Sequence, residues 1–158
     1  MGTDPTGIDR AVWRALEPGL ARGDWERSLQ STRGLLVQNR DSAAVALGMG
    51  ICRFHSRDFG DCIEWMDRAS RLGRGQPAAA DTVLPAAYLF RGLAYAAKRL
   101  PAAAKADLAR LRSYGPTPLQ WERVARVLLP DELERVRRVV DEVGLGTTAG
   151  AGDEARSS

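Results

Sequence analysis

Residues with reactive side chains are scarce in this chain of 158 residues, which contains two cysteines and one histidine. A disulfide framework uses more cysteines than this, and a structural zinc site uses about four ligands. No window shows a sustained alternation of apolar and polar residues, the pattern of a half-buried strand. These absences argue against a disulfide-rich fold, a zinc protein and a β-rich fold.

Lysine is also rare, since Lys98 and Lys105 are the only lysines and arginine supplies the rest of the positive charge. The formal net charge is +3, and acidic residues are interspersed, so we expect no basic face for nucleic acid. The longest apolar run, residues 83–97, is interrupted and too short to span a bilayer. The N-terminus lacks the apolar core of a signal peptide. We therefore expect a cytoplasmic protein without membrane insertion, and the arginine bias is typical of a GC-rich bacterium.

The chain is rich in alanine, leucine and arginine, which favour helices, and a short motif recurs along it. The copies are Gly23-Asp24-Trp25, Arg57-Asp58-Phe59 and Arg99-Leu100-Pro101. The first and second copies are 34 residues apart, and the second and third copies are 42 residues apart. The extra residues fall in LGRGQPAAADT, whose glycines and proline predict a loop insertion after Arg71. A helix-turn-helix period of 34 residues is typical of the tetratricopeptide repeat.

The finer pattern also resembles the tetratricopeptide repeat. The spacing from Gly50 to Cys62 equals that from Gly92 to Ala104, and the resemblance implies that these small residues lie where the two helices of a repeat cross. It further implies an all-α fold in which three repeats form a short right-handed superhelical array with C-terminal capping helices. The expected boundaries are a flexible N-terminus at 1–7, one domain at 8–143 with repeats at about 8–40, 42–72 and 82–116 and capping helices at 117–143, and a disordered tail at 144–158.

Prolines mark two further features. Pro18 falls inside the first helix of the first repeat and predicts a kink or an early end near Glu17. Thr117, Pro118 and Gln120 form a capping box with proline at the first helical position, which predicts the start of a helix. A second C-terminal helix is predicted by an apolar stripe of Leu133, Val136, Val140 and Val143.

The segment ICRFHSRDFGDCIEW, residues 51–65, holds both cysteines and the only histidine. Cys52, His55 and Cys62 offer at most three zinc ligands. A nucleophile pair of Cys52 and His55 would lack an evident orienting group, and a disulfide is disfavoured in cytoplasm. The repeat pattern offers a simpler interpretation, in which both thiols are buried and Cys62 replaces a small crossing residue. We expect no metal, no cofactor and no enzymatic activity.

The first helices of the repeats are apolar nearly all round, and in a short array they would line a partly open concave face. An exposed apolar groove usually marks a partner site. The alternative, that neighbouring repeats and the C-terminal helices bury this face, remains open. The predicted partner-binding residues are Trp13, Leu47, Ile51, Phe54, His55, Leu89, Phe90 and Leu93. Phe54 is the predicted central anchor, because binding energy concentrates in a few central aromatic residues.

A second resemblance is carried by the run Leu47, Gly48, Gly50, Cys52 and Arg53. This run is similar to the middle repeat of bacterial class II type III secretion chaperones. The resemblance implies a chaperone or adaptor that holds an extended hydrophobic segment of a client protein in its groove. It also implies a possible homodimer, although few residues precede Ile8, where that family has its dimerisation helix. The alternative is a scaffold or assembly subunit that binds folded partners in bacterial motility, secretion or signalling.

Overall fold

The computed structural model describes residues 9–114, 125, 126 and 128–142. This part of the chain consists of helices joined by short connections, without strands. The helices with assigned bounds are α1 (Arg10–Arg22), α2 (Trp25–Gln38), α3 (Ala43–His55), α4 (Phe59–Arg74), α5 (Pro77–Ala97), α6 (Pro101–Tyr114), the 3-10 helix η1 (Pro130–Glu132) and α8 (Leu133–Glu142). The all-α class is confirmed, and membership of the tetratricopeptide family stays a prediction.

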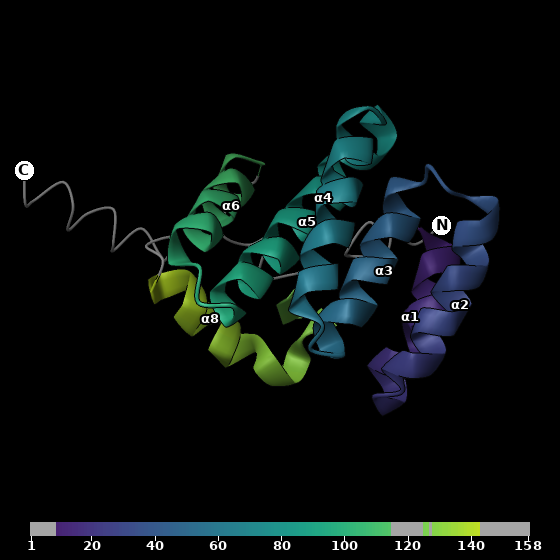
Figure 1. Cartoon of the computed structure of the whole chain (residues 1–158), viewed down its shortest axis with the longest axis horizontal. Coiled ribbons are helices and arrows are strands. Elements are labelled where there is room, and N and C mark those ends of the chain that lie inside the picture. Colours follow the sequence, from purple (N-terminus) through teal and green to yellow (C-terminus); the bar gives the residue numbers. More distant parts are fainter. Residues whose placement is uncertain (1–8, 115–124, 127, 143–158) are drawn as a thin grey trace, which may run out of the picture.

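The helices pack in chain order as three antiparallel pairs, α1 with α2, α3 with α4 and α5 with α6 (Figure 1). Turns of two or three residues join the two helices of each pair. Successive pairs touch through contacts of α3 with α2 and of α4 with α5. The segment of η1 and α8 then crosses the ends of the helices, where α8 packs against α5 (Figure 1).

The recurring sequence motif forms the turn inside each pair. Its first residue has a left-handed backbone in all three copies, with φ of 70° at Gly23, 62° at Arg57 and 60° at Arg99. Its second residue caps the following helix in the first two copies, where the carboxylates of Asp24 and Asp58 accept hydrogen bonds from the backbone N–H three residues on. The motif recurs because each copy ends one helix and starts the next.

Of the two outcomes predicted from Pro18, a kink or an early end near Glu17, the early end does not occur, because α1 continues to Arg22. The ring of Trp25 lies directly over Gly19, where an added β-carbon would come within 2.3 Å of the ring. The N–H of Gly19 donates a buried hydrogen bond of 2.8 Å to Oγ of Ser28. Packing against α2 therefore holds the last turn of α1 in place despite the cost of an internal proline.

The predicted loop insertion after Arg71 is wrong, because the extra residues lengthen two helices. Helix α4 runs on to Arg74, and α5 begins at Pro77, so that only Gly75 and Gln76 connect them. Proline is well suited to the first position of a helix, where its missing N–H would have no partner within the helix. The alanines after it are the best helix formers. A stretch rich in glycine and proline is thus a helix end followed directly by a helix start.

One hydrophobic core runs through the described residues, and the C-terminal segment takes part in it. Ala125, Leu128, Leu129 and Val136 belong to the same cluster of buried residues as the helices of the three pairs. Of the predicted C-terminal stripe, Val136 is buried and Leu133 is partly buried, while Val143 lies outside the described residues, as do 1–7, 117–124 and 144–158. No helix in the described part is long and apolar enough to cross a membrane.

Candidate functional site

The structure closes much of the predicted concave face. Leu47, Ile51, Leu89 and Phe90 are completely buried, so the expectation that they line an open groove is corrected. Helix α3 is packed against α1, α2, α4 and α5, and Leu128 and Leu129 of the C-terminal segment belong to the same core. Trp13 is partly buried against this core and does not line the cavity described next.

The remaining predicted residues, Phe54, His55 and Leu93, line a cavity of about 760 Å³. We call it the helix-turn cavity, because it lies where the turns within the second and third pairs meet the C-terminal segment. Its wall from the helix pairs also contains Arg57, Phe59, Ala96, Ala97, Arg99 and Pro101. Its wall from the C-terminal segment consists of Glu132, Arg135, Val136, Val139 and Glu142.

Three phenylalanines form an aromatic cluster at this cavity. The ring of Phe54 meets that of Phe59 at a centroid distance of 5.6 Å and that of Phe90 at 5.2 Å, both edge to face. Such pairs favour a fixed mutual orientation of their rings. Phe54 and Phe59 are only partly buried, so the cluster gives the cavity a rigid apolar wall anchored in the core through Phe90.

Two arginines, Arg57 and Arg99, stand on the wall at equivalent positions of successive pairs. Glycine is the usual residue at a left-handed helix end, and any other residue there costs about 1–2 kcal/mol. Both side chains are exposed, and neither has a salt-bridge partner among the described residues. Backbone strain of this kind is concentrated at functional sites.

His55 stands at the cavity with one face of its ring covered by Trp25, at a centroid distance of 3.8 Å. Burial lowers the pKa of His55 to about 4, and a hydrogen bond with the backbone of Leu128 acts in the opposite direction. Its Nε2 is buried and has no hydrogen-bond partner within the described part of the chain. The ring is therefore neutral near pH 7 and ties α3 to α2 and to the C-terminal segment.

The two cysteines are free and buried. Burial raises the pKa of Cys52 to about 11, with an opposing contact from Thr32, and burial also raises the pKa of Cys62. Thiols of this kind stay protonated near neutral pH and are poor nucleophiles. Within the described residues, no group of three or more histidine, cysteine or acidic side chains is placed to hold a metal ion.

The predicted crossings bring helices together at glycines, and a β-carbon added at Gly92 would lie 3.5 Å from the backbone oxygen of Ala104, although the nearest side chains come from the residues one turn further along the second helix. A β-carbon added at Gly50 would lie 2.6 Å from Cε of Met66, four residues after Cys62. One added at Gly92 would lie 2.9 Å from Cγ of Leu108, four residues after Ala104. Cys62 and Ala104 are completely buried. The helices of the second pair and of the third pair thus cross at equivalent positions.

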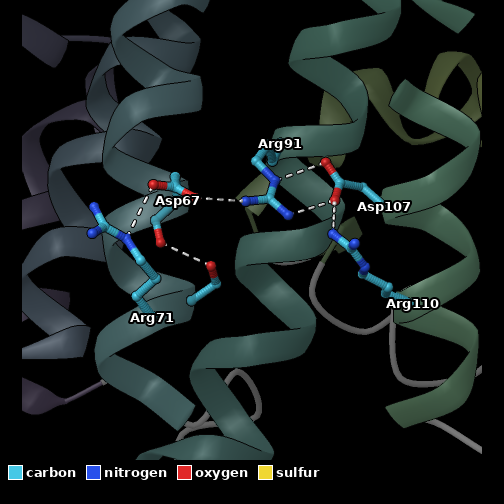
Figure 2. Close-up of polar contacts among 6 residues, drawn as sticks. Asp67, Arg71, Arg91, Asp107 and Arg110 are labelled. Carbon is cyan, nitrogen blue, oxygen red and sulfur yellow. Dashed lines mark hydrogen bonds and ion pairs between the residues drawn. The ribbon is translucent and has the colours of Figure 1, made fainter. Parts of the chain in front are cut away.

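Sequence reasoning missed a buried ion-pair network in which Arg91 lies between Asp67 and Asp107 (Figure 2). Arg91 donates from Nε and Nη2 to the two carboxylate oxygens of Asp107, at 2.8 and 2.6 Å, and from Nη1 to Asp67 at 3.3 Å. Burial alone would lower the pKa of Arg91, but the bonds and charge of Asp107, with help from Tyr95 and Asp67, raise it. The signal in the sequence was an arginine inside an apolar run.

The network links three helices, because Asp67 lies on α4, Arg91 on α5 and Asp107 on α6. Arg91 is 8% exposed and Asp107 is 2% exposed, so the pair has little access to a ligand. We assign it a structural role, fixing how the second and third pairs dock.

The helix-turn cavity is thus the candidate site, since it combines an aromatic wall with two arginines that have no salt-bridge partner in the described chain. Its chemistry suits the binding of an apolar group that carries negative charge. Comparison of the chain with protein-family models, with curated proteins and with solved structures finds no significant match in any of the three.

Proposed function

We propose that this protein is a protein-interaction module that binds a segment of a partner protein at the helix-turn cavity. The observation that carries the proposal is the pairing of an aromatic wall, Phe54 and Phe59, with the strained arginines Arg57 and Arg99 on one cavity. Aromatic residues and arginine are the residue types enriched where binding energy concentrates in protein interfaces.

The size of the site supports this proposal. A cavity of about 760 Å³ has room for several side chains of a peptide, and pockets that bind ligands usually measure roughly 300–1,000 Å³. Leu100, which stands in the chain between the wall residues Arg99 and Pro101, is 46% exposed.

The buried groups support a binding role over a catalytic one. A cysteine–histidine nucleophile pair needs a thiolate and a basic imidazole. Burial raises the pKa of Cys52 and lowers that of His55, which opposes both requirements. The cavity wall offers arginines, glutamates and apolar groups, a set suited to recognition.

At the finer level we propose a bacterial cytoplasmic chaperone or adaptor that holds a hydrophobic client segment, as the resemblance to class II type III secretion chaperones implies. The site proposed for the client differs from the earlier expectation. It lies at the turns within the helix pairs, where the partly buried Phe54 and the largely buried Leu93 line the cavity, and it excludes the completely buried Leu47 and Ile51.

The test begins with peptides selected from a random displayed library against the full chain, whose affinities are measured by calorimetry. Ala97→Trp places a bulky side chain on the cavity wall at an exposed position. The control Ala106→Trp makes the same change at an exposed position of α6 that does not line the cavity. We expect Ala97→Trp to weaken binding at least about tenfold, which is roughly 1.4 kcal/mol, and the control to leave it unchanged.

Two results would contradict the proposal. One is equal binding of the selected peptides to both folded tryptophan variants, which would place the interaction elsewhere. The other is a chain that binds no peptide but does bind a folded partner domain, and this result would favour the scaffold alternative.

A further inference from the structure

The C-terminal segment is held in two different ways before and after Pro130. Before it, Ala125, Leu128 and Leu129 are at most 2% exposed and belong to the core, and the N–H of Leu129 donates to the carbonyl of Ala125 at 2.7 Å. After it, α8 packs against α5, and Val136 is the only buried side chain among those of α8 that the structure describes. The segment thus has an anchored part that ends at Leu129 and a second part, α8, that is held by less.

The joint between these two parts is interrupted in its backbone hydrogen bonding. Leu129 has a non-helical backbone, with φ of −136° and ψ of 52°, and Pro130 has no N–H with which to continue a helix. The joint itself is the 3-10 helix η1, where the N–H of Glu132 donates to the carbonyl of Leu129 at 3.1 Å. A short 3-10 stretch between helices often marks a hinge. Helix α8 can therefore turn about η1 without breaking its own hydrogen bonds.

A movement of α8 would open or close the helix-turn cavity, because α8 forms one wall of it. Val136 and Val139 line the cavity from α8, whereas Leu93 and Ala97 line it from α5. Helix α8 has ten residues, and an isolated helix of that length is marginal in water. Elements with few buried contacts open most readily, so α8 should leave the cavity at a lower cost than unfolding of the helix pairs.

We propose that α8 is a hinged flap of the helix-turn cavity. It turns about η1, opens to admit the partner segment and closes over it, while Leu128 and Leu129 stay in the core. The cavity of about 760 Å³ exists with α8 in place, so the closed flap leaves room for side chains of a bound segment. The closing step rests on the proposed function, whereas the hinge is a property of the free chain.

The hinge is tested by amide hydrogen exchange of the full chain, followed residue by residue with nuclear magnetic resonance. A flap exposes its own amides while the helix pairs stay folded. The amides of α8 should therefore exchange at least about 100-fold faster than the slowest amides of α3 and α5, after correction for intrinsic rates. Their exchange should also respond little to low concentrations of urea, since a local opening exposes little surface. Equal protection and equal urea dependence in α8 and α3 would overturn the proposal.

Two matched valine-to-alanine variants sharpen this test. Val136 is 3% exposed, and Val45 on α3 is 4% exposed and does not line the cavity. Val136→Ala weakens the closed flap, so exchange in α8 should become about tenfold faster. Val45→Ala weakens the helix pairs equally with the flap open or closed, so it should speed exchange in α3 about tenfold and leave α8 unchanged. If Val45→Ala speeds exchange in α8 as much as in α3, α8 unfolds only with the whole domain and the flap is refuted.

Peptides that bind at the cavity in the test of the proposed function give the test of closure. A saturating peptide should slow the exchange of α8 at least about tenfold, because the flap closes over it. Unchanged or faster exchange of α8 in the complex would refute closure and leave the proposed function standing. A free chain whose α8 opens alone but which binds no peptide would support the hinge and refute the proposed function, so the two failures are distinguishable.

Discussion

The imidazole of His55 lies flat on the indole of Trp25, with centroids 3.8 Å apart and ring planes within 1° of parallel. The contact joins the end of α3 to the start of α2. The backbone of Leu128 lies close enough to the same ring to raise its pKa. A single neutral side chain thus connects two helix pairs and the C-terminal segment.

This arrangement predicts a loss of stability in mild acid. The pKa of His55 falls from 6.5 to about 4 on folding, so between these values the unfolded chain binds more protons than the folded one. The contribution of the neutral ring is present above pH 6.5 and is lost as the pH falls to about 4, by roughly 3 kcal/mol in total. The measurement is urea unfolding from pH 4 to 8 for the wild type and for His55→Phe, which keeps a ring on Trp25 and cannot titrate. Parallel pH profiles of the two proteins would contradict the prediction.

Replacing the strained arginines by glycine should stabilise the fold and impair binding. Arg57→Gly and Arg99→Gly relieve a left-handed backbone at a helix end, and each should raise the free energy of unfolding by about 1 kcal/mol. Arg57→Gln and Arg99→Gln keep the strain and should leave stability nearly unchanged. Thermal unfolding and peptide affinity are measured on all four variants. If glycine lowers the melting temperature, the strain is not present.

Removal of one partner of the buried ion pair should lower the free energy of unfolding. Asp107→Ala leaves the guanidinium of Arg91 buried without its two short hydrogen bonds, which should cost about 3–5 kcal/mol. The double variant Arg91→Met with Asp107→Leu removes both charges and should recover most of the loss. Denaturant unfolding checks the comparison, and a double variant less stable than the single one would show that the polar network itself is required.

Because α3 and α4 lie close together at Gly50, a large side chain at this position should destabilise the fold. Gly50→Leu would push into Met66, whose Cε lies 2.6 Å from the position of an added β-carbon, and overpacking of this kind costs about 1–3 kcal/mol. The control is Gly34→Leu on α2, where an added β-carbon meets nothing within 4 Å and leucine favours the helix. Melting temperatures should fall for the first variant and hold or rise for the second. Equal changes would show that the two helices can separate freely at Gly50.

The three helix pairs could be predicted from the sequence because the residues that end one helix and begin the next are neighbours in the chain. Asp24 and Asp58 cap helices from within the turn, and a cap needs only the few residues around it. The effect of Pro18 was not predictable in this way, since α1 continues through it with the help of Ser28 and Trp25. Those contacts come from another helix, and packing of that kind overrides local preference.

The binding face was predicted only in part, for a similar reason. Phe54, His55 and Leu93 line the cavity, but Leu47 and Ile51 are buried. An apolar surface on every side of a helix predicts that other helices pack around it. It does not predict which side of the helix stays accessible. That depends on where the C-terminal segment lies, and no short-range pattern in residues 125–142 encodes this position.

The ion pair between Arg91 and Asp107 also has a thermal consequence. The cost of removing charges from water falls as temperature rises, while stabilisation by apolar burial levels off. Since this pair lies among α4, α5 and α6, its share in holding those helices together grows on heating. The first pair, α1 and α2, has no ion pair to the rest of the described chain. Heat should therefore loosen the N-terminal pair before the other two.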